Sequence, residues 1–135
     1  MPSVIKLIEQ DHREVEELFS QFEQSGDKKI AMKICQELDA HTEAEEKAFY
    51  PVVRAEVEAG LVKEAEKEHG EARQLIGRIK QTSDSEHLAE LVAELKQDVE
   101  HHVQEEESEM LPKARESLGE SRLSEIGRAF QEAKD

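Results

Sequence analysis

Two histidine–glutamate pairs with a spacing of four residues lie on apolar stripes of the sequence. The pairs are His41 with Glu45 and His102 with Glu106. Because residues i and i+4 lie one turn apart on the same face of an α-helix, each pair can direct an imidazole and a carboxylate to one side. Unpaired polar groups in an aliphatic core each cost about 1–3 kcal/mol, and a buried carboxylate costs more. A bound cation would remove that cost, so the pattern favours metal binding.

Two further histidines, His12 and His69, belong to separate stretches of the chain and bring the imidazoles to four. Four histidines and two glutamates exceed the ligand set of one tetrahedral zinc and suit a pair of borderline metals that carboxylates bridge. We expect two iron ions because the donor set is rich in nitrogen; manganese is the alternative. With a shared oxo or hydroxo group, each metal would be about five-coordinate and keep an open position for a small ligand.

Apolar residues that recur three and four positions apart predict the helices that position these side chains. The few glycines and prolines, together with a capping box at Ser83 and Glu86, mark the expected boundaries between these helices. The first helix is expected from about Ser3 to Gln24, and a short last helix from about Ser121 to Lys134. Two helices lie between Asp27 and Ile79, separated near Pro51 and Gly60, and a fourth carries the stripe from Leu88 to Glu106.

The two halves of the sequence resemble each other. A shift of 61 residues or of 57 residues superposes the chemically important positions. The superposed pairs are His41 and His102, Glu45 and Glu106, Glu46 and Glu107, Pro51 and Pro112, and His12 and His69. Short loops favour neighbouring helices of opposite direction. We therefore expect an all-α fold: an antiparallel up-down four-helix bundle with an internal two-helix duplication, in one domain over residues 1–135, with the bundle at about 3–117.

The four histidines lie at matching distances from the expected turns. His12 lies about 14 residues before the first turn and His41 about 15 residues after it, at about 1.5 Å per residue. His41 and His69 come level if the second helix kinks or stops near Pro51. His69 and His102 differ by only about 3 Å, less than one helical turn. All four imidazoles can therefore meet at one level of the bundle.

The composition disfavours two classes of partner. The 135 residues include 33 acidic and 18 basic side chains, for a formal net charge of -15. This excess repels phosphates and so disfavours nucleic acid and anionic membrane surfaces. No apolar run approaches the roughly 18 residues of a membrane span, and Met1-Pro2-Ser3 does not begin a signal sequence. The single cysteine, Cys35, excludes an internal disulfide and fits a reducing compartment, so we expect a cytoplasmic protein.

Four segments in this order resemble the hemerythrin-like (HHE cation-binding) domain, over about residues 3 to 117. The segments are His12; Leu38-Asp39-Ala40-His41-Thr42-Glu43-Ala44-Glu45-Glu46, ending in Phe49-Tyr50-Pro51; Glu68-His69; and His102-Val103-Gln104-Glu105-Glu106, ending in Met110-Leu111-Pro112. The resemblance implies a di-iron centre that handles oxygen, peroxide or nitric oxide, or that holds or senses iron. It also implies that the four histidines are terminal ligands and that Glu45 and Glu106 are the bridges.

One position departs from the oxygen-carrying hemerythrins. Those proteins have an additional histidine four residues before the third-helix histidine, where this chain has Ala65. With that imidazole missing, both metals would keep an open position. We therefore expect oxidation by oxygen more than reversible oxygen carriage.

Several other polar residues have simpler interpretations. Glu9 and Glu66 each precede a candidate histidine by three residues, as in ferritin-type bundles, but pairs of this kind are common in so acidic a sequence. Tyr50 lies about 13 Å along a straight helix from His41, so ordinary packing is expected unless a kink brings it nearer. His101 points about 100° away from its neighbour and is expected to be solvated or to support a ligand.

The Glu105-Glu106-Glu107 run is interpreted mainly as a solvated face, because only Glu106 falls on the apolar stripe. The leading functional hypothesis is a di-iron protein that binds or reacts with a small ligand such as O2, H2O2 or NO, in oxidative or nitrosative stress or in iron handling. The alternatives are a catalase-like enzyme that decomposes peroxide, an iron-responsive module, and a bundle without metal. No acid–base pair of a separate active site can be identified, and the sequence indicates no protein partner.

Overall fold

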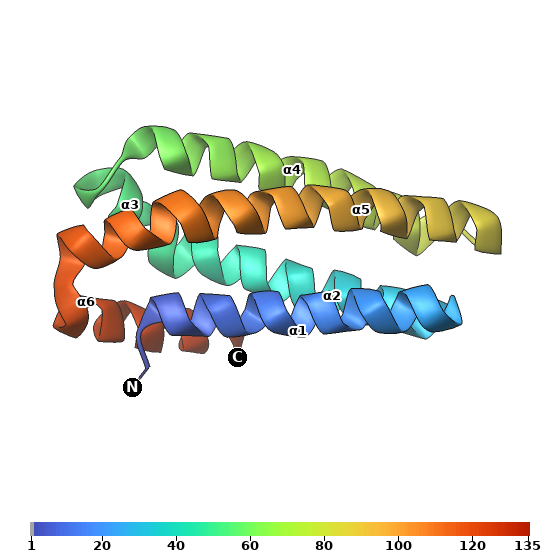
Figure 1. The fold of residues 1–135 in the computed structure, drawn as a ribbon, viewed down its shortest axis with the longest axis horizontal. Helices are drawn as coiled ribbons and strands as arrows, with labels where there is room; N and C mark the ends of the chain where they lie inside the picture. Colours follow the sequence, from blue (N-terminus) through green and yellow to red (C-terminus); the bar gives the residue numbers. More distant parts are fainter. Residues whose placement is uncertain (1) are drawn as a thin grey trace.

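The computed structural model describes residues 2–135, which form helices and short turns with no strand among them. Four long helices lie side by side along the molecule (Figure 1). They are α1 (Val4–Ser25), α2 (Lys28–Ala44), α4 (Ala59–Gln81) and α5 (Ser85–Glu105). The expected helical bundle is therefore confirmed.

Local capping interactions explain where α1 and α2 begin and end. The Ser3 hydroxyl accepts a hydrogen bond from the Lys6 amide at the start of α1. At its end, Gly26 has a φ of 64°, which glycine tolerates because it lacks a Cβ atom. The Asp27 carboxylate then accepts a hydrogen bond from the Lys29 amide and starts α2. Gly26 and Asp27 therefore make the tight turn between α1 and α2.

The predicted capping box before α5 is wrong by one residue. Asp84, and not Ser83, is the cap, because its carboxylate accepts a hydrogen bond from the His87 amide at 3.0 Å. A carboxylate also interacts favourably with the positive N-terminal end of the helix dipole, which a neutral serine cannot match.

Two π-helical turns follow α2 and α5. They are η1 (Glu45–Phe49) and η2 (Glu106–Met110), and each begins on the glutamate of a His-x-x-x-Glu pair. α3 (Tyr50–Glu56) and α6 (Leu111–Lys134) continue directly from these turns, with a proline in the first turn of each. Because a π turn bonds residues i and i+5, the chain passes each proline without ending the helix.

The apolar core consists of two clusters at the two ends of the bundle. One cluster includes Phe19, Ile34 and Leu95, and the other includes Phe49 and Phe130. The candidate polar residues lie between the clusters, so water has little access to them from either end.

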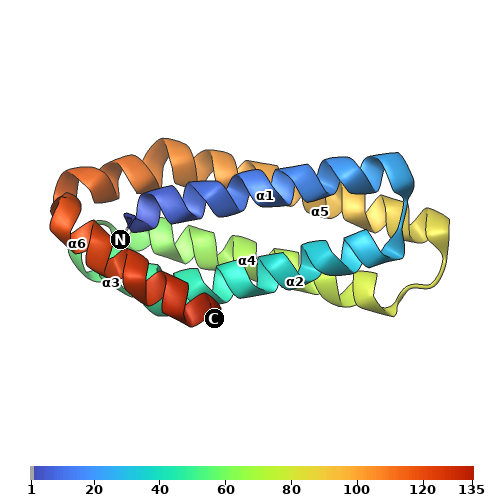
Figure 2. The same ribbon diagram turned by 90° about the horizontal axis from the view of Figure 1, so that it is seen from below.

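The last helix closes one end of the bundle. α6 bends at Gly119, where φ is 78°, and its second part packs across α1 and α2 (Figure 2). A Cβ atom on Gly127 would lie 2.3 Å from the Pro2 carbonyl oxygen, so only glycine permits this close approach. Among residues 2–135, no helix combines the length and apolar composition needed to cross a bilayer.

Candidate metal centre

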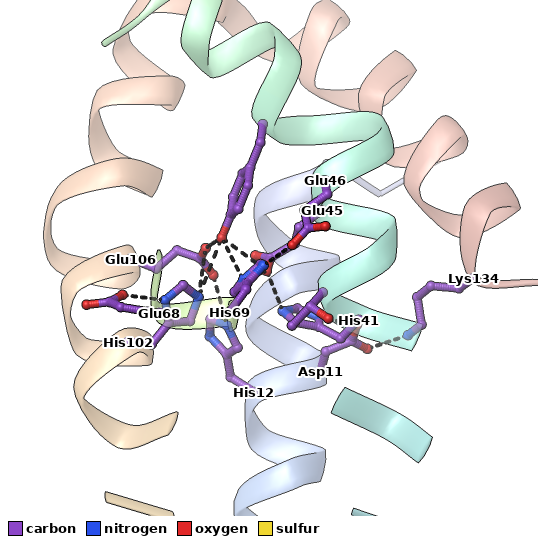
Figure 3. Close-up of polar contacts among 12 residues, drawn as sticks. Asp11, His12, His41, Glu45, Glu46, Glu68, His69, His102, Glu106 and Lys134 are labelled. Atoms are coloured by element: carbon purple, nitrogen blue, oxygen red, sulfur yellow. Dashed lines mark hydrogen bonds and ion pairs between the residues drawn. The ribbon is translucent and has the colours of Figure 1, made fainter. Parts of the chain in front are cut away.

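Six inward-facing side chains converge at one level of the bundle (Figure 3). Each of the four long helices contributes one imidazole, and each π turn contributes one carboxylate from its first residue. The six residues are those predicted from the sequence: His12, His41, Glu45, His69, His102 and Glu106. Five of them are buried, and the His102 side chain is 12% exposed.

One group of donor atoms comes from α1, α2 and the two π turns. His12, His41, Glu45 and Glu106 each offer an atom within 4.8 Å of the others. His12 Nε2 lies 3.0 Å from Glu106 Oε1, and His41 Nε2 lies 3.3 Å from Glu45 Oε1. This group can surround one cation.

A second group lies on the side of α4 and α5. Glu45, His69 and His102 each offer an atom within the same 4.8 Å limit. His69 Nε2 lies 3.2 Å from Glu45 Oε1, and His102 Nε2 lies 3.4 Å from Glu106 Oε2. Glu106 thus presents one oxygen to each pair of histidines, and Glu45 lies between the pairs. This is the arrangement that two bridging carboxylates require.

Each imidazole is held by a carboxylate on its other nitrogen. A carboxylate only accepts hydrogen bonds, so every Nδ1–H donates and the neutral ring has its Nε2 lone pair directed to the centre. The pairs are His12 with Glu107 (2.6 Å), His41 with Asp11 (2.7 Å), His69 with Glu46 (2.7 Å) and His102 with Glu68 (2.7 Å). This tautomer is the one in which histidine binds metals through Nε2.

Several buried atoms at the centre have no hydrogen-bond partner. They include Nε2 of His12, Nε2 of His41, Oε2 of Glu45 and Oε1 of Glu106. These nitrogen and oxygen atoms lie close together, but their geometry is not that of hydrogen bonds. Each buried polar atom without a hydrogen-bond partner costs about 1–3 kcal/mol. Imidazole nitrogens and carboxylate oxygens suit iron, manganese and zinc. The residues therefore fit a metal centre.

The histidines and carboxylates of the centre shift one another's pKa. Burial alone would lower the pKa of His41, but the Glu45 and Asp11 carboxylates outweigh it and raise that pKa to about 10. Burial would likewise raise the pKa of Glu106, yet the histidines His102 and His12 hold it well below its usual range. A bound cation would compensate the same buried carboxylates.

Tyr50 lies among the donor atoms of the second group, although ordinary packing was expected. Its hydroxyl donates to Glu106 Oε2 at 2.6 Å and lies 3.2 Å from Glu45 Oε1. The same oxygen is 3.2 Å from His69 Nε2 and 3.5 Å from His102 Nε2. Burial and the two nearby carboxylates raise the pKa of Tyr50 well above its usual value.

The other residues weighed from the sequence lie outside this centre. Glu66 pairs with Arg54 at 2.8 Å, and half-buried Glu9 belongs to neither group of donors. His101 is 66% exposed and lies beside Glu105 at the surface. Cys35 is buried, and burial raises its pKa to about 11.

The expectation that Glu107 belongs to a solvated face is wrong. Its side chain is only 24% exposed, and it accepts hydrogen bonds from His12 and Arg13. The supporting carboxylates Asp11, Glu46 and Glu68 were also missed. The signal that could have found them is the repeat itself, because the 57-residue shift superposes Asp11 on Glu68 and the 61-residue shift superposes Glu46 on Glu107.

A small apolar cavity adjoins all four imidazoles on the side of the Leu95 cluster. Its volume is about 30 Å³, and Val15, Leu38, Ile76 and Val99 are among the side chains that line it. A volume of roughly 10–15 Å³ on this measure accepts one water molecule. The cavity therefore has room for a ligand of about two heavy atoms.

A helical bundle with four imidazoles and two carboxylates in its core defines a metal-binding bundle protein. The chain belongs to the hemerythrin HHE cation-binding domain family, whose model matches residues 3–114. It is also 32% identical over 133 residues to a protein named "DNA nickase" from Nostoc sp. (strain PCC 7120 / SAG 25.82 / UTEX 2576). That match covers 95% of this chain but only 38% of the relative. A search of solved structures gave no significant match.

Proposed function

We propose that the chain is a non-haem di-iron protein that binds or reacts with a small ligand derived from oxygen or nitrogen. The single observation that supports this most is the set of buried donor atoms without hydrogen-bond partners at the centre. His12 and His41 would hold one iron, His69 and His102 the other, and Glu45 and Glu106 would bridge them. The two irons would supply Lewis-acid and redox chemistry for the ligand.

Tyr50 is a further candidate donor to the second iron. Its oxygen lies 2.6–3.5 Å from four atoms that would bind that metal. Donor atoms that share one metal at about 2.0–2.2 Å lie roughly this far apart. Tyr50 has no counterpart in the other half, since the 61-residue shift places Leu111 there. The two irons would therefore be unequal.

The neighbouring cavity supports a diatomic or peroxide-sized ligand. Its volume of about 30 Å³ and its apolar lining fit O2, NO or H2O2 better than a larger substrate. Ala65 supplies no imidazole to the second iron, and the first iron has no counterpart of Tyr50, so the first iron would keep a position open for a ligand. We propose oxidation by oxygen in preference to reversible carriage, with a role in oxidative or nitrosative stress or in iron handling.

Decomposition of peroxide is the second candidate, and the Tyr50 hydroxyl favours it. Cleavage of two H2O2 molecules to two H2O and one O2 requires protons to move between oxygens. Tyr50 has a buried O–H group 2.6 Å from the Glu106 carboxylate, so in this candidate Tyr50 would stay unbound to iron and exchange a proton with Glu106. Oxygen release from peroxide by the iron-loaded protein tests this candidate.

We also propose that the bundle is antiparallel and that its halves arose by duplication. The two π turns are five residues long and begin at Glu45 and Glu106, 61 residues apart. The supporting contacts repeat in the same way: the pair His12–Glu107 corresponds to His69–Glu46, and His41–Asp11 corresponds to His102–Glu68. An inexact two-fold symmetry relates the halves.

We propose that the protein acts in the cytoplasm without nucleic acid. The relative named for DNA nicking is much longer, and its activity does not transfer with a match to 38% of its length. The formal net charge of -15 gives a phosphate backbone little to bind. The single thiol, Cys35, is free and buried, as a reducing compartment permits.

Rapid mixing of the diferrous protein with O2 tests the proposed reactivity. We expect conversion to a stable diferric form, which absorbs in the near ultraviolet. A long-lived oxygen adduct that releases O2 under vacuum would contradict this proposal and support reversible oxygen carriage.

A further inference from the structure

A third group of potential metal ligands lies at the surface, next to the centre. Glu68 on α4 and His101 and Glu105 on α5 each offer an atom within 4.8 Å of the others. His101 Nε2 lies 2.5 Å from Glu105 Oε1 and 3.6 Å from Glu68 Oε2. One imidazole and two carboxylates are suitable donors for a divalent first-row transition metal.

Glu68 has a buried oxygen that lacks a hydrogen-bond partner. Its side chain is only 10% exposed, and its Oε1 atom accepts the hydrogen bond from His102. Its Oε2 atom is inaccessible to water, makes no hydrogen bond and faces His101. A buried carboxylate oxygen without a hydrogen-bond partner is costly unless a cation compensates it. This atom indicates that the surface group is a cation site.

A cleft connects this surface group with the metal centre. Its volume is about 110 Å³, and both the surface carboxylates Glu68 and Glu105 and the central residues His102 and Glu106 line it. Ala65 also lines the cleft, and its methyl group leaves space that a larger side chain would fill. A metal ion at the surface group is thus already beside two ligands of the second iron.

The cleft has a strongly negative lining. Glu64 and Glu109 lie along it in addition to the two surface carboxylates. Within residues 2–135, neither Glu64 nor Glu109 forms an ion pair with a lysine or arginine. Clefts of one charge concentrate ions of the opposite charge and raise their association rates.

We propose that Glu68, His101 and Glu105 capture a divalent transition-metal ion and pass it along the cleft to His102 and Glu106. The route depends on the proposed function, because its destination is the di-iron centre. His101 is 66% exposed and Glu105 is 38% exposed, so the site holds its ion weakly enough to release it. Glu68 belongs to both sites, since one oxygen faces the captured ion and the other positions His102.

The rate of metal loading tests this proposal. Tyr50 is the only tyrosine and the chain has no tryptophan, so its fluorescence should fall when Co²⁺ enters the centre. The 135-residue chain, stripped of metal with a chelator, is mixed with Co²⁺ alone. We expect the double variant His101→Ala with Glu105→Gln to load at least about tenfold more slowly and to reach the same final Co²⁺ content at the centre. The control is His87→Ala with Glu90→Gln, another exposed pair on α5, which should load at the wild-type rate.

A loading rate of the double variant equal to that of wild type would overturn the proposal. A variant without the central bridges, Glu45→Ala with Glu106→Ala, separates this outcome from failure of the proposed function. It should still bind Co²⁺ at the surface group, and adding the His101 and Glu105 substitutions should lower the bound Co²⁺ by one ion per chain. No Co²⁺ in the bridge variant, with two in wild type, would refute the surface site alone. Wild-type protein that binds Co²⁺ only at the surface site would refute the di-iron centre instead.

Discussion

Replacing Glu107 by alanine tests whether the supporting carboxylates contribute to metal affinity. Glu107 accepts a hydrogen bond from His12 Nδ1 at 2.6 Å and one from Arg13 at 2.7 Å. Helical periodicity alone places Glu107 on the solvated face and predicts that its loss leaves metal binding unchanged. The structure predicts weaker binding, because the imidazole would lose the contact that fixes its tautomer and orientation.

The expected magnitude follows from the burial of the carboxylate. Loss of such a partner weakens metal binding about 10- to 100-fold, or by about 1.4–2.7 kcal/mol. The Glu107 side chain is 24% exposed, so water can replace part of the lost contact and the effect should be near tenfold. Asp11, which supports His41, is 10% exposed, so Asp11→Ala should approach 100-fold.

Competition with a coloured chelator for Co²⁺ gives the Kd of each variant. Glu100→Ala is the control. Glu100 lies on α5, its side chain is 58% exposed, and its ion-pair partner is Lys96 at 3.8 Å and not a histidine of the centre. Its Kd should equal that of wild type. Equal Kd values for Glu107→Ala and the control, in folded protein, would refute the role assigned to the supporting carboxylates.

Three further predictions have direct outcomes. Glu45→Ala or Glu106→Ala should lose at least one iron per chain by elemental analysis, whereas exposed Glu16→Ala should retain both; equal iron in all three would place the centre elsewhere. Tyr50→Phe should abolish the visible phenolate-to-ferric-iron absorption while the iron content is unchanged, and a band that persists would exclude Tyr50 as a ligand. Cys35 should resist Ellman's reagent at pH 8 in folded protein and react after unfolding, because burial raises its pKa to about 11 and the thiol stays protonated below that pH; rapid labelling of folded protein would contradict this.

The helices and the inward-facing residues could be predicted because they depend on periodicity. The first helix was expected from Ser3 to Gln24 and is Val4–Ser25 in the structure. His41 and His102 each lie one turn from a candidate glutamate on an apolar stripe, so one face of the helix carries both. Short loops then bring the faces to one level.

Tyr50 and the supporting carboxylates could not be predicted in the same way. In an α-helix, Tyr50 would lie about 140° around the axis from Glu45. The π turn joins the Tyr50 amide to the Glu45 carbonyl and brings the two residues back toward one face. Among 33 acidic residues, periodicity does not identify those that reach an Nδ1 atom, because that contact depends on the packing of another helix.

The metal content of protein produced with iron tests the central claim most directly. Elemental analysis of the purified 135-residue chain gives the number and kind of metal ions. The four imidazoles and two carboxylates at the centre predict close to two irons per chain. One zinc per chain, or no metal in protein grown with sufficient iron, would contradict the account.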